Sequence, residues 1–226
     1  MRALRLVLMV ALGAASPRGS AAQDAAARMD GRVPADVARA VQAIAEGARA
    51  RGLPVEPLIQ KAIEGSAKGV PAERVIEAVR VLAGRLDEAQ GALREAGIAT
   101  PGADAVEGGA YALTAGLTAS QVRELVRLSQ PSYDPALTLH VAATLTALGV
   151  PPEQSLQVLA RRIQARQGAN ELLDLPNEVE VGMARGATPA EATREVEETE
   201  SQQGVAGASA APPPPNRPAR ANPHKP

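Results

Sequence analysis

A short motif recurs along this chain and limits what the chain can fold into. At Gly52–Glu56 and again at Gly69–Glu73, a glycine is followed by an apolar residue, a proline and, two residues later, a glutamate. Glycine commonly ends a helix, whereas proline with a nearby acid commonly begins one. The core of the motif, an apolar residue before Pro or Thr and then an acid or Ser, recurs at Val33–Asp36, Leu117–Ser120, Val150–Glu153 and Leu175–Glu178, and more loosely at Thr188–Glu191. The motif therefore predicts short helices joined by tight turns.

Composition favours the same fold class. The 226 residues are 45% hydrophobic, yet they include no Phe, Trp or Cys, and the only aromatic residues are Tyr111 and Tyr133. Alanine-rich sequences favour helix, whereas strands are normally enriched in aromatic and β-branched residues. Base-stacking surfaces and aromatic cages need rings that this chain lacks, and a net charge of −1 argues against a nucleic-acid surface. We expect an all-α protein without disulfides.

The first 22 residues have the pattern of a secretory signal peptide. Arg2 and Arg5 precede an apolar run from Leu6 to Leu12, and a small-x-small cleavage site ends at Ala22. The apolar run is too short to span a membrane, and no later run reaches that length. We therefore expect an exported protein, periplasmic or extracellular, with cleavage after Ala22 and no membrane span.

Apolar periodicity predicts the helices of the remaining chain. They are expected at about 35–50, 55–67, 72–96, 103–115, 119–129, 135–148 and 152–167, with weaker ones at about 177–185 and 189–199. Helix 72–96 has the most regular apolar seam, and we expect it to pack within the chain rather than to form a coiled-coil dimer. The expected organisation is a linker at 23–32, an irregular array of about seven or eight short-to-medium helices at 33–199 joined by Gly-apolar-Pro/Thr turns, and a disordered proline-rich tail at 200–226.

The spacing of the turns leaves a repeat architecture open. Glycines 52, 69, 116, 149 and 186 are separated by 17, 47, 33 and 37 residues. The last two intervals fit one helical hairpin per unit, and the first two do not. No tetratricopeptide, ankyrin or armadillo consensus is present, so duplication of a degenerate hairpin stays a hypothesis.

Two motifs at the turn around Leu117 suggest specific functions. The spacing of Ala112, Gly116 and Val122 is that of a helix-turn-helix, which would place Arg123 and Arg127 on a DNA-recognition helix. The export signal and the neutral charge disfavour DNA binding.

The same turn also has the letters of a family motif. Residues Leu117-Thr118-Ala119-Ser120-Gln121 resemble the LTxxQ motif of the Spy/CpxP-like periplasmic chaperones and stress sensors. The resemblance covers five residues, and no second copy of the motif is found. It implies a helical periplasmic chaperone, and it is also the pattern of a helix capping box.

No pattern in the sequence indicates catalysis or a cofactor. There is no Cys, the two histidines are His140 and His224, and the zinc-ligand and phosphate-loop patterns are absent. His140 lies at the edge of an apolar stripe, where we expect a hydrogen-bonded, half-buried side chain. Acids concentrate in first helical turns, where the helix dipole already favours them. We therefore expect no catalytic, cofactor-binding or metal-binding residues.

The function that the sequence favours is a non-enzymatic scaffold or protein-interaction module acting outside the cytosol. Its partner would be another protein of unknown identity, and the oligomeric state is open. A periplasmic chaperone-like or stress-sensing protein is the first alternative, and a helix-turn-helix DNA-binding protein is a less favoured second.

Overall fold

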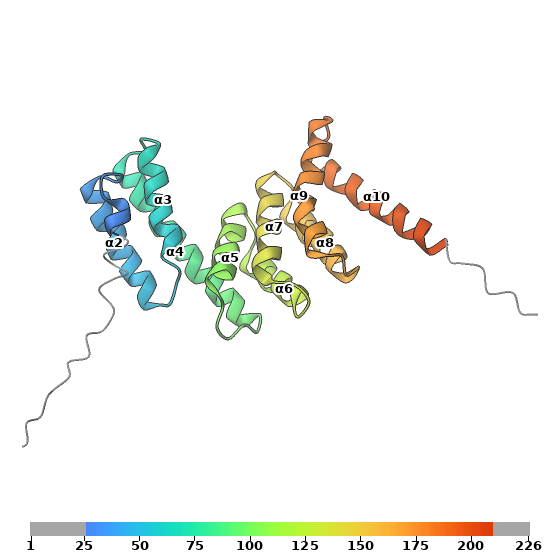
Figure 1. Cartoon of the computed structure of the whole chain (residues 1–226), viewed down its shortest axis with the longest axis horizontal. Coiled ribbons are helices and arrows are strands. Elements are labelled where there is room, and N and C mark those ends of the chain that lie inside the picture. The colour runs from blue at the N-terminus through green and yellow to red at the C-terminus, as the bar shows by residue number, and fades with distance from the viewer. Residues whose placement is uncertain (1–25, 210–226) are drawn as a thin grey trace, which may run out of the picture.

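The computed structural model describes residues 26–209, and these form an all-α protein, as the sequence predicts. Helices α2 to α10 follow one another with short connections and no strand among the described residues (Figure 1). Their bounds are α2 Ala35–Ala50, α3 Glu56–Ala67, α4 Ala72–Glu95, α5 Ala103–Ala115, α6 Ala119–Ser129, α7 Pro135–Ala147, α8 Pro152–Gln164, α9 Ala169–Ala184 and α10 Pro189–Ser209. Residues 26–29 are also helical, so the number of helices slightly exceeds the expected seven or eight. The expected signal peptide and residues 210–226 of the expected tail lie outside the described residues.

The recurrent turn is a Schellman cap fused to the start of the next helix. At the turn between α3 and α4, Gly69 has φ of +67° and donates its N–H to the Ser66 carbonyl at 3.0 Å, and Val70 donates to the Gly65 carbonyl at 3.0 Å. The next residue, Pro71, is already the N-cap of α4. Because only residues 68–70 separate the last residue of α3 from the N-cap of α4, this turn reverses the chain with almost no loop.

Side-chain caps form at two other helix starts, including the capping box that the sequence predicts at Thr118. Thr118 accepts a hydrogen bond from the Gln121 N–H at 3.3 Å, and Gln121 Oε1 accepts one from the Thr118 N–H at 2.8 Å, which completes a capping box at α6. Asp134 caps α7 by accepting from the Ala136 N–H at 2.9 Å. Both interactions satisfy N–H groups that have no partner within the helix.

The apolar residues of the turns differ in burial. Leu53 and Leu117 are buried, with 5% and 3% of their surface exposed. Val70, which the sequence pattern pairs with Val75 as a hydrophobic staple, is 37% exposed, whereas Val75 is 2% exposed. The staple interpretation therefore fits the turn at Leu117 better than the turn at Val70.

Helices α5 to α10 form three stacked hairpins. Helices α5, α7 and α9 lie in one row, and α6, α8 and α10 lie in a second row beside it (Figure 1). The hairpin turns meet along one edge, where Gln121 Nε2 lies 3.4 Å from Glu153 Oε1 and Gln154 Nε2 donates to the Ala190 carbonyl at 3.0 Å. The hairpin spacing inferred from the last two glycine intervals thus corresponds to a structural unit.

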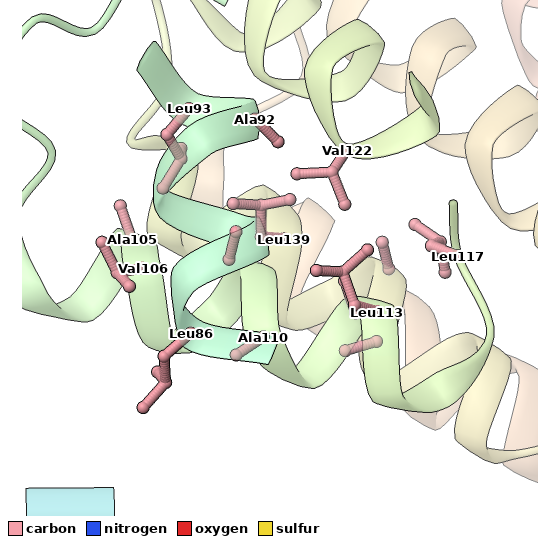
Figure 2. Packing of buried hydrophobic residues seen from close by; sticks show 14 of the residues in the cluster. Leu86, Ala92, Leu93, Ala105, Val106, Ala110, Leu113, Leu117, Val122 and Leu139 are labelled. Atoms are coloured by element: carbon pink, nitrogen blue, oxygen red, sulfur yellow. The ribbon is translucent and has the colours of Figure 1, made fainter. Parts of the chain in front are cut away.

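The core between α4, α5 and α7 depends on two glycines. Side chains from α5, α6 and α7, including Leu113, Val122 and Leu139, point toward one another beside α4 (Figure 2). A Cβ at Gly109 would lie 3.0 Å from the Ala89 Cβ, and one at Gly108 would lie 3.3 Å from the Leu139 Cβ. The paired glycines therefore allow α5 to pack closely against both neighbours, although glycine costs about 1 kcal/mol in a helix interior.

Four boundaries differ from the sequence prediction. The expected linker is packed at residues 26–32, where Met29 is 1% exposed and Arg28 forms an ion pair with Glu56. The helix expected at 177–185 begins at Ala169 and contains Pro176, so the motif copy at Leu175–Glu178 is not a turn. Helix α8 ends at Gln164 rather than near 167.

At the C-terminal side, α10 continues to Ser209, ten residues beyond its expected end. The reason is that no proline occurs between its first residue and position 212. Residues 200–209, which were expected to belong to the tail, are helical.

Candidate functional site

The most developed concavity in the described chain is a cleft of about 670 Å³ at the C-terminal end of the array. We call it the terminal cleft. It lies between the C-terminal part of α8, helix α9 and helix α10, at the end of the array that is red and orange in Figure 1. Its lining contains four glutamates, two arginines and two valines, which are Glu171, Glu178, Glu195, Glu198, Arg162, Arg185, Val181 and Val196.

Arg162 forms the floor of the terminal cleft and holds α9 against α8. Its guanidinium group donates one hydrogen bond to the Glu171 carbonyl in the first turn of α9 and another to Glu178 Oε2 two turns later. The Arg162 side chain is only 2% exposed, whereas that of Glu178 is 39% exposed. A buried cation needs such partners, because removing it from water costs several kcal/mol. Arg162 is therefore a structural clamp at the base of the cleft.

Arg162 lies in the last turn of α8, where a cation also interacts favourably with the helix dipole. A sequence signal for its burial exists, because Arg162 follows Val158 by four residues and Leu159 by three, which places it on the apolar face of the helix. A charged residue at such a position needs a hydrogen-bonding partner of opposite charge. That partner, Glu178, is sixteen residues away, and its proximity depends on how α9 folds back.

The walls of the terminal cleft are acidic and partly apolar. Val181 is 50% exposed on α9, and Val196 faces it from α10. Arg185 Nη2 lies 3.6 Å from Glu195 Oε2, and both side chains are more than half exposed. Such an exposed pair contributes little to stability, so Glu195 remains open to other cations. The four carboxylates outnumber the two guanidinium groups, which gives the cleft lining a formal charge of −2.

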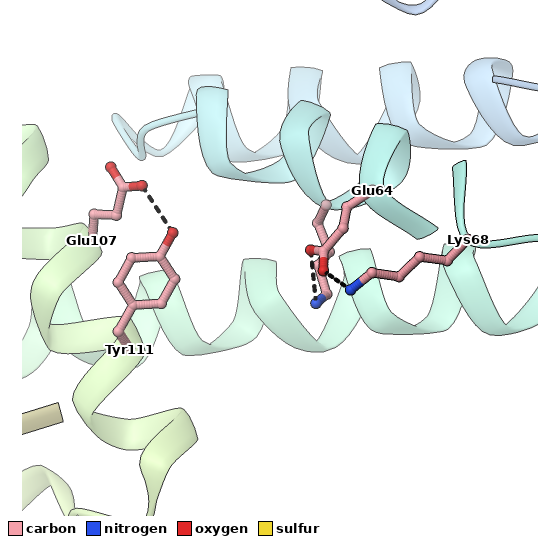
Figure 3. A network of polar contacts seen from close by, with 5 residues as sticks. Glu64, Lys68, Glu107 and Tyr111 are labelled. Carbon is pink, nitrogen blue, oxygen red and sulfur yellow. Dashed lines mark hydrogen bonds and ion pairs between the residues drawn. The ribbon is translucent and has the colours of Figure 1, made fainter. Parts of the chain in front are cut away.

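A second polar surface lies on α3 and α5 (Figure 3). Lys68 donates a hydrogen bond to Glu64 on α3, and this lowers the pKa of Glu64. On α5 the Tyr111 hydroxyl donates to Glu107 Oε1 at 3.2 Å, and burial, followed by the negative charge of Glu107, raises the pKa of Tyr111. A phenol with a raised pKa stays protonated at neutral pH, which does not suit a general base or nucleophile. These contacts are local to each helix.

Arg123 and Arg127, the arginines of the candidate recognition helix, both contact Glu95 of the same chain. Arg123 Nη1 lies 2.9 Å from Glu95 Oε2, and Arg127 Nη2 donates to the Glu95 carbonyl at 3.0 Å. Both contacts join α6 to the C-terminal end of α4. The geometry thus gives these arginines a packing role and offers no support for a recognition helix.

The histidine expected to be half-buried is exposed. His140 lies on the outer side of α7, and its carbonyl accepts a hydrogen bond from Thr144 Oγ1 at 2.9 Å. His224 lies outside the described residues. Within residues 26–209, no group of three or more His, Asp or Glu side chains could hold a metal ion, and no helix has the length and hydropathy to cross a bilayer.

Comparisons with protein-family models, with curated proteins and with solved structures found no match for this chain.

Proposed function

We propose that this protein is an exported, non-enzymatic protein-interaction module that binds a basic segment of a partner protein in the terminal cleft. The observation that carries the proposal is the composition of the cleft, in which exposed Val181 lies among glutamates of α9 and α10. A helical array holds such a cleft on rigid elements, so little conformational entropy is lost on binding. Carboxylates at the rim would attract cationic side chains, and the valines would contact their aliphatic parts.

The acidic residues that define the proposed interaction are Glu195 and Glu198, one helical turn apart on α10. The Glu195 carboxylate forms the exposed ion pair with Arg185, and Glu198 is an exposed residue of the cleft lining. Neither residue belongs to the core. Changing both to lysine therefore reverses the charge of the cleft without removing a buried contact.

The test is capture of exported proteins by the immobilised mature chain, which begins at residue 23. The variant Glu195→Lys/Glu198→Lys is compared with Glu77→Lys/Glu88→Lys, which makes the same charge change on exposed positions of α4. We expect a partner that is retained by the unmodified chain and the α4 variant, lost by the α10 variant, and released as salt is raised to about 0.5 M. Identical captured sets from all three chains would refute the proposal.

Our second proposal is a chaperone-like role, which is based on the LTxxQ motif at residues 117–121. The capping box at Thr118 and Gln121 gives the motif a local structural role in starting α6. The assay that separates the two functions is suppression of the aggregation of an unfolded client by the mature chain. Suppression that is insensitive to Glu195→Lys/Glu198→Lys would favour the chaperone role over binding in the terminal cleft.

A further inference from the structure

We infer that the terminal cleft is also a docking site for the chain's own C-terminal segment, residues 210–226. This inference rests on the proposed function of the cleft and names an intramolecular occupant for it. The segment directly follows α10, which forms one wall of the cleft, so the occupant is covalently attached beside its site.

Charge complementarity is the first argument. Residues 210–226 contain Arg217, Arg220 and Lys225 and no Asp or Glu. The cleft lining carries a formal charge of −2, and Glu195 and Glu198 project from its α10 wall. Opposite charges attract when they come within about a Debye length, which is about 8 Å at physiological salt.

The spacing of the charges is the second argument. Proline-rich segments favour the polyproline II conformation, which has three residues per turn, so Arg217 and Arg220 would lie on the same side. Glu195 and Glu198 are three residues apart on α10 and share one helical face. Two arginines on one side of an extended segment can therefore approach two carboxylates on one side of a helix. Prolines between and before the arginines lower the entropy lost on docking.

The length of the segment is the third argument. From Glu195 to the end of α10 at Ser209 the helix rises about 21 Å, at 1.5 Å per residue. From Ser209 to Arg217 an extended chain covers about 25 Å, at 3.1 Å per residue. The segment is thus long enough to turn back at the end of α10 and to place Arg217 beside Glu195. A tether of this length gives an effective concentration in the millimolar range, so weak contacts suffice.

The consequence is competition for the terminal cleft. A basic partner segment must displace residues 210–226, so the affinity of the cleft for a partner is lower while the segment is present. Docking would also cover the exposed side chain of Val181 on α9.

The absence of cysteine allows a direct test on the full mature chain. Spin labels are placed at Ala184→Cys, on the exposed side of α9 outside the cleft lining, and at Ala221→Cys in the segment. Electron–electron resonance then measures the distance distribution at low salt. We expect a narrow, short component that is unchanged on tenfold dilution with unlabelled chain. We expect its loss in Glu195→Lys/Glu198→Lys, in about 1 M NaCl and with excess synthetic peptide of residues 210–226.

Several outcomes would overturn the inference. A broad, long distribution in the unmodified chain would exclude docking. A short component that depends on labelled-chain concentration would mean docking on a second copy, and one that persists after charge reversal and in high salt would exclude the acidic cleft as the site. If the distances are long while partner capture still depends on Glu195 and Glu198, this inference fails and the proposed function stands.

Discussion

Arg166 occupies a backbone position that glycine holds at the other caps of this type, and replacing it should stabilise the protein. It has φ of +55° and is the only non-glycine residue with positive φ in the described chain. Its N–H donates to the Ile163 carbonyl at 3.0 Å, and the next N–H, of Gln167, donates to the Arg162 carbonyl at 3.1 Å. This is the hydrogen-bond pattern of the Schellman caps at the glycine turns, with arginine at the left-handed position.

The size of the effect follows from two opposing terms. A left-handed conformation costs a residue with a Cβ about 1–2 kcal/mol. Glycine in the unfolded chain has more conformational entropy to lose, which offsets about 0.5–1 kcal/mol. Arg166→Gly should therefore raise the free energy of unfolding by about 0.5–1 kcal/mol, which corresponds to a rise in Tm of about 1–4 °C for a domain of this size. The reverse change, Gly69→Ala, should lose a similar amount, because no atom lies within 4 Å of its added Cβ.

Thermal and urea unfolding followed by circular dichroism at 222 nm measures both changes. Arg166→Ala is the matched control, since it removes the long side chain and keeps the Cβ that causes the strain. We expect no comparable gain from Arg166→Ala. Equal stabilisation by Arg166→Ala and Arg166→Gly would show that the side chain, and not the backbone conformation, is responsible.

Three further predictions concern packing and ionisation. Gly182→Ala should lower the free energy of unfolding, measured by urea titration, by about 1–3 kcal/mol, because the added Cβ would lie 2.7 Å from the Ala192 Cβ on α10. Gly84→Ala, which has no atom within 4 Å of the added Cβ, should raise the free energy of unfolding by about 0.5–1 kcal/mol. Leu53→Ala should lower the free energy of unfolding by about 2–5 kcal/mol, because Leu53 is buried, whereas Val70→Ala should lower it by less than about 1 kcal/mol, because Val70 is partly exposed. Similar losses for the two variants would contradict this prediction. A hydrogen bond from Arg28 lowers the pKa of Glu56 in the folded protein. The ionised Glu56 therefore stabilises the fold above its unfolded pKa of about 4.3, and this stabilisation is lost as pH falls through the lower folded pKa. Replacing that arginine with glutamine should raise the pKa of Glu56, measured by NMR titration, and an unchanged pKa would refute the assignment.

Local signals explain why much of the fold could be predicted from the sequence. Proline, threonine and glycine act within a few residues of their own position, so the turns at Gly69 and Leu117 follow from the chain alone. The same local reasoning is wrong at Pro176, because packing of Leu172 and Leu175 on one face of α9 holds the helix through a proline that lacks a donor. It also overlooks the cap at Arg166, where no glycine marks the end of α8.

The terminal cleft could not be predicted in this way, because it depends on which helix faces meet. Its carboxylates come from α9 and α10, and its floor is an arginine of α8 whose partner is sixteen residues away. The direction in which α10 leaves the array depends in turn on the close approach at Gly182, where one added methyl group would separate α9 from α10. Burial of Arg162 then fixes α9 against α8, and the exposed glutamates of α10 line the same cleft as Val181. The stability and the charge of the cleft are therefore separable: substitutions at Gly182 and Arg162 should change its shape, whereas substitutions at Glu198 should change only what it attracts.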